Sequence, residues 1–329
     1  APEDVGLSSQ RLARISPWMS RYVDNHKLPG ALTLVSRRGE VVFLEEQGVR
    51  DLQTGSALRL DSIFRFYSMS KPVTSVAAMM LYEEGCFQLD DPLSKYLPEL
   101  AEMRVYRLGE GEKLLSEPAA SPITIQQLLT HTSGFTYGFS NPGPIGELYR
   151  KARADFGGRA GPLSEVVSRL ARIPLMHHPG TRWHYGVSTD VLGYLIEVVS
   201  GMTLDAFLAE RVFEPLGMVD TAFCVPASKL DRFTSLYGLD EAGRMTLLDA
   251  IDGRYVEGRV TTFSGGGGLL STLGDYYRFT EMLRRGGASE ECRLLSRKTV
   301  QYMTSNHLPG DLASMGQASF NETTFSGIG

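Results

Sequence analysis

The chain has 329 residues, of which 42% are hydrophobic and 22% are charged, which is typical of a soluble globular protein with a large core. Its formal net charge of −5 argues against nucleic acid or an anionic membrane as the main partner. No apolar run approaches membrane-spanning length, and the three cysteines are too widely spaced for a disulfide framework or a metal site. We therefore expect a cytoplasmic protein, or a periplasmic or secreted one if a leader has been removed.

The first part of the chain predicts a helix that packs against strands. Apolar residues recur at helical spacing within residues 8–27, which indicates an amphipathic helix. Residues 31–36 and 41–46 are β-rich runs joined by a short turn, which is typical of a hairpin, and 63–67 is a third short strand. A helix followed by antiparallel strands indicates an α+β layer.

The stretch Ser68-Met69-Ser70-Lys71 joins this third strand to a strongly apolar helix that we expect to end at Gly85. Residues three apart on a helix share a face, so the Lys71 amine can reach the Ser68 hydroxyl. A serine hydroxyl is a weak nucleophile until a neighbouring base takes its proton. The pair therefore predicts a nucleophilic serine. The alternative is that Ser68 caps the helix while Lys71 reaches solvent.

Between residues 71 and 263 the pattern is mostly helical and irregular. Thr124 and Gln127 have the spacing of a capping box. Residues 136–162 are rich in glycine, proline and aromatic residues, so we predict a long loop that could line a pocket. The glycine run 265–268 has no following lysine and predicts tight backbone packing rather than a phosphate site. Helices are expected over 123–130, 163–173, 191–200, 204–213 and around 275–283.

Tyr185 stands between a turn and a helix. It could act as a general base toward Ser68 if a cation such as Lys71 favours its phenolate. The alternative is a packed tyrosine whose hydroxyl bonds a backbone group. The candidate walls of a substrate pocket are Phe135, Tyr137, Phe139 and Trp183.

Two other kinds of catalytic site are less consistent with the sequence. His177, His178 and His184 cluster with Asp190, but their spacing matches no common zinc pattern, so we expect no metal and no cofactor. His131 is expected to cap the end of a helix. No GxSxG motif is present, which disfavours an α/β-hydrolase.

Four stretches of the sequence form a recognisable set: residues 64–71, 124–134, 179–185 with the helix that comes next, and 266–275. Together they resemble the serine β-lactamase and penicillin-binding-protein superfamily, and within it the class C-like branch that includes the family VIII carboxylesterases. The resemblance implies a β-lactamase-like α+β fold, with an antiparallel sheet flanked by helices (1–70 and 266–329), a mainly helical domain (71–265) and an active site between them.

The resemblance also implies a role for each site residue. Ser68 would be the acylated nucleophile, Lys71 its proton acceptor or electrostatic partner, and Tyr185 the base that relays the proton and activates the deacylating water. The backbone N–H of Ser68 would form half of the oxyanion hole. A second donor would come from a KTG, HxG or WxG motif on a late strand, which we do not find. We expect the closing strands, and this donor, to lie outside the chain, for example on a separate C-terminal segment that completes the sheet.

The residue two positions after Tyr185 indicates which class of substrate the site should accept. In the β-lactamase-type YxN motif it is an asparagine that bonds the substrate amide, whereas here it is Val187, which would line the pocket. A site without that contact should handle simple esters better than β-lactams or peptides. We therefore predict a serine carboxylesterase for small-molecule esters. The alternatives are a β-lactamase, a D-alanyl-D-alanine peptidase and a non-catalytic binding module; the oligomeric state is not readable.

Overall fold

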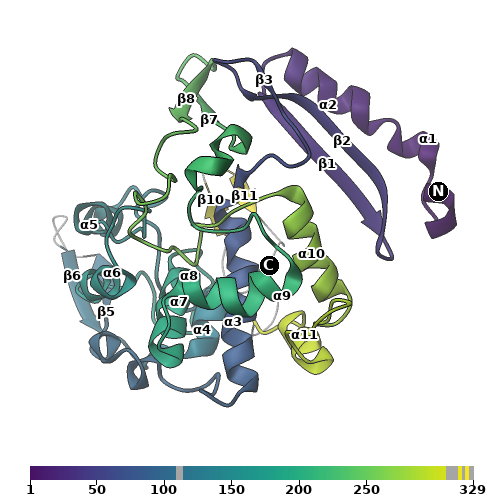
Figure 1. The fold of residues 1–329 in the computed structure, drawn as a ribbon. Coiled ribbons are helices and arrows are strands. Elements are labelled where there is room, and N and C mark those ends of the chain that lie inside the picture. Colours follow the sequence, from purple (N-terminus) through teal and green to yellow (C-terminus); the bar gives the residue numbers. More distant parts are fainter. Residues whose placement is uncertain (109–113, 309–317, 321–322, 326–329) are drawn as a thin grey trace. The chain divides into compact units, whose positions relative to one another are not determined.

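The computed structural model describes residues 1–108, 114–308, 318–320 and 323–325 (Figure 1). It divides into two compact units. Unit 1 comprises Ala1–Arg65, Leu216–Val260 and Leu270–Arg285; unit 2 comprises Phe66–Pro215, Thr261–Leu269 and Gly286–Gly329. These units differ from the predicted domains, 1–70 with 266–329 and 71–265, chiefly in two segments: residues 216–260 belong to unit 1, and residues 286–329 belong to unit 2.

In unit 1, a helix packs on an antiparallel sheet. Strands β1 (Gly30–Arg37) and β2 (Glu40–Asp51) form the predicted hairpin, and β3 (Ser56–Ala57) pairs with the other edge of β2. Helix α2 (Ile15–Asp24) contacts both long strands and follows the short helix α1 (Ser9–Leu12) (Figure 1). The predicted helix, hairpin and α+β class are thus confirmed, with one break in the helix.

Residues 216–260 join unit 1 through a second core. Ile63 pairs with Phe233 through a parallel bridge, and strand β4 (Phe64–Arg65) pairs with β9 (Leu270–Ser271). These pairings link positions far apart in sequence, which explains why the local pattern did not place residues 216–260 in this unit. The buried cluster around them consists of Ile63, Val225, Phe233 and Leu270.

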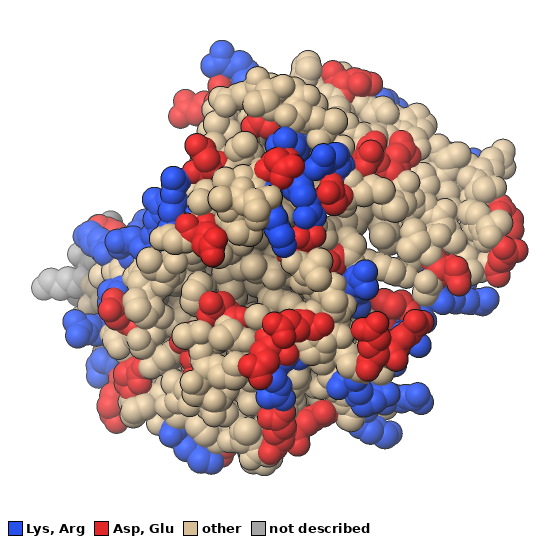
Figure 2. Space-filling view, viewed as in Figure 1, with Lys and Arg blue, Asp and Glu red and all other residues tan. Residues whose placement is uncertain are grey.

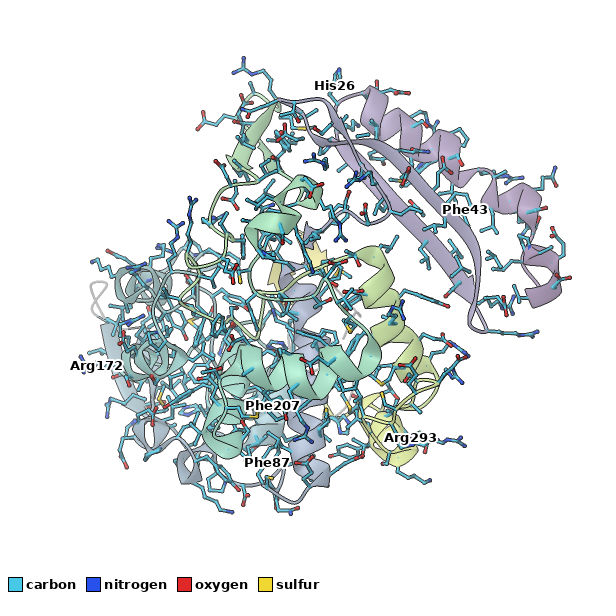
Figure 3. The ribbon with its side chains drawn as sticks, in the orientation of Figure 1. His26, Phe43, Phe87, Arg172, Phe207 and Arg293 are labelled. Carbon is cyan, nitrogen blue, oxygen red and sulfur yellow. The ribbon has the colours of Figure 1, made fainter. Side chains whose placement is uncertain are left out.

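Unit 2 is built around α3 (Ser70–Glu83), the predicted apolar helix. Residues 76–80 of α3 are at most 6% exposed, and α7 (Ser188–Ser200) packs against it. The capping box at Thr124 is confirmed and begins α4 (Ile125–Leu129), which contacts α7. Phe87 and Phe207, labelled in Figure 3, are buried in this helical body.

In three segments that were predicted to be irregular or mostly helical, the structure shows a different element. Strands β5 (Arg104–Leu108) and β6 (Leu114–Pro118) form a hairpin in unit 2, and β7 (Leu236–Leu239) and β8 (Met245–Asp249) form another in unit 1. The predicted loop 136–162 contains α5 (Pro144–Ala152), because Pro144 occupies the first turn, where a missing N–H is tolerated.

The remaining elements complete the two units. Among the described helices none is long and apolar enough to span a membrane alone, although Ser188–Ser200 and Leu204–Leu216, bent by 83°, pass that test as a pair. Basic and acidic side chains are interspersed on the face drawn in Figure 2. The other elements are η1 (Pro2–Val5), η2 (Tyr67–Met69), η3 (Leu93–Lys95), η4 (Pro98–Leu100), α6 (Leu163–Leu170), α8 (Leu204–Leu208), the π-helical η6 (Ala209–Phe213), α9 (Glu214–Leu216), η7 (Ala227–Arg232), α10 (Leu273–Arg284), α11 (Arg297–Met303), and the paired β10 (Ala318–Phe320) and β11 (Thr323–Phe325).

Candidate active site

Ser68 lies in η2, the single turn that precedes α3. The preceding residue, Tyr67, has a φ of 44°, a left-handed conformation that is uncommon for a residue other than glycine. Lys71 lies in the first turn of α3, and its Nζ donates a hydrogen bond to Ser68 Oγ at 3.3 Å. The predicted reach of Lys71 to Ser68 is therefore confirmed.

Tyr185 meets the same serine from a distant part of the chain. Its hydroxyl donates to Ser68 Oγ at 2.7 Å across a separation of 117 residues. Lys71 Nζ lies 4.7 Å from the centroid of the Tyr185 ring, so the lysine can stabilise negative charge on the phenol. The three residues predicted to act together are thus in contact, and all three belong to unit 2.

Lys71 has two further partners that the sequence did not indicate. Its Nζ donates to the carbonyl oxygen of Gly266 at 2.6 Å and to the Tyr137 hydroxyl oxygen at 3.2 Å. With Ser68 Oγ these make three acceptors around one nitrogen. A lysine ammonium has three N–H donors and no lone pair, so this arrangement fits the charged form.

Tyr137 acts as a buried link rather than as an exposed pocket wall. Its side chain is 6% exposed, and its hydroxyl donates to Asp190 Oδ2 at 3.4 Å. Burial raises the pKa of Tyr137 well above 10, and the nearby Asp190 carboxylate adds to the rise. Tyr137 therefore keeps its proton while Tyr185, bonded to Ser68, is placed to exchange one.

Asp190 lies in the first turn of α7 and is 1% exposed. Burial raises its pKa, and this rise is opposed by the charge of Lys71 and by hydrogen bonds from Ser264, Gly266 and Tyr137. Sequence reasoning considered Asp190 only as a metal ligand. A better signal was an aspartate directly before the apolar run of α7, because buried acids almost always have partners.

The glycine run lies against these residues. Asp190 Oδ1 accepts from the Gly266 N–H at 3.0 Å and from the Ser264 hydroxyl, and Ser70 Oγ accepts from the Leu269 N–H at 3.1 Å. A Cβ on residue 266 would lie 2.3 Å from Asp190 Oδ2, so only glycine fits. The predicted tight backbone packing of this run is confirmed.

Two predicted pocket walls have no exposed surface. Phe135 and Val187 are 0% exposed, because both side chains point into the helical core, and we no longer place them on a substrate-binding surface. Trp183 is half-buried, with its ring centroid 6.2 Å from that of Tyr185. Phe139 is 56% exposed and stacks on Tyr137 at 4.8 Å.

Two partly buried histidines, His131 and His184, are neutral because burial lowers their pKa values. The His131 ring centroid is 4.9 Å from that of Tyr185, and burial lowers the pKa of His131 to about 3 although the residue keeps some exposed surface. Its Nδ1 is buried and has no partner among the described residues. Burial also lowers the pKa of His184, to about 4. In the described part of the chain no three His, Cys, Asp or Glu side chains are arranged to hold a metal ion.

The oxyanion hole stays a prediction. Ser68 stands in the turn before the N-terminus of α3, which suits a backbone N–H donor, but its role there is untested. Lys298 and Thr299, the nearest match to a KTG motif, lie in helix α11 and not on a strand. No second donor is assigned among the described residues.

Comparisons with known proteins agree with this geometry. The family model Beta-lactamase matches residues 15–320. Protein Rv1367c of Mycobacterium tuberculosis is 39% identical over 281 residues, covering 85% of this chain and 68% of that protein. Esterase EstB of Burkholderia gladioli is 31% identical over 300 residues, covering 86% and 73%. The solved structure of EstCE1, "a hydrolase with promiscuous acyltransferase activity", has a TM-score of 0.74 and 26% identity, covering 88% and 76%.

The family match spans almost the whole chain, and the predicted β-lactamase-like fold is shown by the solved structure as well. The relatives of stated activity include esterases and acyltransferases, which supports a hydrolase of this superfamily here. This chain therefore belongs to the Beta-lactamase family, within the serine β-lactamase and penicillin-binding-protein superfamily.

Proposed function

We propose that this protein is a serine carboxylesterase that cleaves small carboxylic esters through an acyl-enzyme on Ser68. The observation that carries the proposal is the position of Ser68 Oγ, 2.7 Å from the Tyr185 hydroxyl and 3.3 Å from Lys71 Nζ. A serine in contact with a potential base and a cation is the arrangement that nucleophilic catalysis needs. The likeness to esterase EstB supports an ester as the substrate.

The contacts suggest how protons move during acylation. In the reactive form Tyr185 is a phenolate, which the Lys71 ammonium favours. Tyr185 takes the Ser68 proton as Oγ attacks the ester carbonyl carbon, and the carbonyl oxygen becomes an oxyanion. When this intermediate collapses, the bond to the alcohol oxygen breaks, and the Tyr185 proton passes to that oxygen. The alcohol leaves and the acyl group stays on Ser68.

Deacylation reverses these transfers with water as the nucleophile. Tyr185, again a phenolate, takes one proton from water as the water oxygen attacks the acyl carbon. The second intermediate collapses, the bond to Ser68 Oγ breaks, and Oγ regains a proton from Tyr185. A carboxylic acid is released. Lys71 keeps its three donors in place throughout.

The residue two positions after Tyr185 favours an ester over a β-lactam as the substrate. Residue 187 is a buried valine, so this position provides no side-chain amide to bond an amide substrate. A site that leaves a buried amide unpaired discriminates against amides. We expect short-chain esters to react faster than a chromogenic β-lactam.

A chromogenic short-chain ester tests the proposal. Ser68→Ala should lower kcat at least about a thousandfold, whereas Ser164→Ala, at an exposed position of α6, should keep the rate of the unaltered protein. A fluorophosphonate probe should add one label, on Ser68, by intact mass and peptide mapping. An unchanged rate in folded Ser68→Ala would reject Ser68 as the nucleophile. A folded protein that hydrolyses no ester would reject the esterase.

Acyl transfer to an alcohol is a second candidate. The structurally similar EstCE1 is a hydrolase with promiscuous acyltransferase activity, and an acyl-enzyme can react with an alcohol in place of water. If an alcohol is added during ester turnover, a transferase yields a second ester, detectable by chromatography. A pure hydrolase yields only the acid.

A further inference from the structure

We propose that Asp190 is a positioning residue of this site, whose carboxylate holds the Gly266 peptide and the Tyr137 hydroxyl that in turn hold Lys71 beside Ser68. The expected effect on ester turnover rests on the proposed function. The hydrogen-bond network itself rests only on the distances between the residues.

The two carboxylate oxygens of Asp190 serve different partners. Oδ1 accepts from the Gly266 N–H at 3.0 Å and from the Ser264 hydroxyl. Oδ2 accepts from the Tyr137 hydroxyl at 3.4 Å. With a side chain 1% exposed, Asp190 makes these bonds away from solvent, where charged hydrogen bonds are strongest.

Both partners of Asp190 also bind Lys71. The Gly266 peptide gives its N–H to Asp190 and accepts from Lys71 Nζ on its carbonyl, at 2.6 Å. The Tyr137 hydroxyl gives its proton to Asp190 and accepts from Lys71 at 3.2 Å. Two bridges therefore join the carboxylate to the ammonium, and each fixes the direction in which its middle group points.

A purely local role for Asp190 does not explain these contacts. An acid in the first turn of a helix often stabilises that helix through its free N–H groups. These hydrogen bonds to the Asp190 carboxylate come instead from residues 137, 264 and 266, all outside α7. The carboxylate thus organises the surroundings of Lys71 and not only its own helix.

The charge of Asp190 matters as well as its hydrogen bonds. The titratable groups that face Lys71 are Asp190 from α7, Tyr137 and Tyr185 from two loops, and His131 from the end of α4. Asp190 is the only carboxylate among these four. Its negative charge lies at the far end of the two bridges that hold Lys71 Nζ.

Asp190→Asn removes the negative charge of the side chain and nearly keeps its shape. The amide oxygen can still accept from the Gly266 N–H, but the amide nitrogen would donate toward Tyr137 and reverse that hydroxyl. We expect kcat for the ester to fall about tenfold or more, whereas KM should stay within about threefold, because the substituted side chain positions Lys71 and does not bind the substrate. Asp275→Asn, another buried aspartate but in unit 1, is the matched control and should keep the rate.

A second measurement does not depend on turnover. In protein labelled with ¹³C at lysine Cε, the Lys71 resonance, assigned by its loss in Lys71→Ala, should change its chemical shift at a fixed pH in Asp190→Asn, because the groups that hold Nζ are rearranged. If Asp190→Asn does not fold, Tyr137→Phe, which removes one bridge and keeps the ring, should show both changes.

The outcomes separate the two proposals. Absent ester turnover in the unaltered protein would reject the esterase and leave the Lys71 chemical shift to decide the role of Asp190. An unchanged Lys71 chemical shift and an unchanged kcat in folded Asp190→Asn, or in Tyr137→Phe if the former does not fold, would overturn the role of Asp190. Ester turnover lost in Ser68→Ala would still support the esterase in that case.

Discussion

Lys71 donates to the carbonyl of Gly266 at 2.6 Å, although 195 residues separate the two in the chain. The N–H of the same glycine bonds Asp190, so one backbone residue orients a cation on one side and a carboxylate on the other. This relationship makes the glycine run a structural part of the candidate site.

Gly266→Ala should therefore disturb both catalysis and stability. The added Cβ would lie 2.3 Å from Asp190 Oδ2, so the loop or α7 must shift. We expect a loss of about 1–3 kcal/mol in the free energy of unfolding and at least about a tenfold loss in ester turnover. Urea unfolding and kcat measure the two effects.

Gly157→Ala is the matched control, because nothing lies within 4 Å of its added Cβ. It should change the free energy of unfolding by no more than about 0.5 kcal/mol. If Gly266→Ala behaves like Gly157→Ala, the close packing of the glycine run against Asp190 is wrong.

The features that residue spacing alone predicted correctly are local ones, whereas the contact of Tyr185 with Ser68, 117 residues away, was implied by the resemblance to a family. Ser68 and Lys71 are three residues apart at the start of one helix, so helical geometry alone brings them together. The capping box at Thr124 depends on residues three positions apart. The β1–β2 hairpin follows from two adjacent β-rich runs.

The features that the sequence missed depend on contacts between distant residues. Tyr137 and Asp190 are 53 residues apart, and Asp190 and Gly266 are 76 apart, so no periodicity or spacing reveals that they meet. The direction of a side chain in an irregular segment is equally hidden. Phe135 was predicted to face a substrate as part of an aromatic loop, and Val187 because it is two residues after Tyr185, whereas both side chains are buried in the core.

Tyr185→Phe distinguishes the two possible bases. The ring and its contact with Trp183 remain, but the hydroxyl bonded to Ser68 is lost. If Tyr185 is the base, kcat should fall about 10²–10⁴-fold while the thermal midpoint changes little. If turnover stays within about threefold of the unaltered protein, Lys71 must take the Ser68 proton instead.

His131 should make the protein less stable in acid. Burial lowers its folded-state pKa to about 3, while an unfolded histidine has a pKa of about 6.5. Below about pH 6.5 the unfolded chain therefore binds a proton that the folded protein does not, and the free energy of unfolding falls as pH drops from about 6.5 toward 3. His131→Asn should remove at most one proton from this dependence, about 1.4 kcal/mol per pH unit.

Urea unfolding at several values between pH 7 and pH 5 measures that slope. Asparagine tolerates the left-handed backbone at position 131, where φ is 54°. His26→Asn is the matched control, since His26 is exposed and has a φ of 52° (Figure 3). Equal slopes in the His131 and His26 variants would show that His131 titrates alike in the folded and unfolded protein.

The buried ion pair between Arg65 and Asp249 is expected to stabilise unit 1. Arg65 donates to Asp249 Oδ2 through Nε at 3.0 Å and through a terminal nitrogen at 2.6 Å, and the two side chains are 3% and 5% exposed. Arg65→Met would leave the Asp249 charge buried beside an apolar side chain. We expect a loss of about 3–5 kcal/mol in the free energy of unfolding, measured with urea.

The exposed pair Arg244 and Asp240 provides the comparison, because the Arg244 side chain is 80% exposed. Arg244→Met should cost no more than about 1 kcal/mol, since solvent screens surface ion pairs. The double variant Arg65→Met with Asp249→Leu removes both buried charges and should recover part of the loss, because the desolvation cost disappears with them. A double variant no more stable than Arg65→Met would mean that the contacts of Asp249 with the Arg254 N–H and guanidinium, and not its pairing with Arg65, stabilise this core.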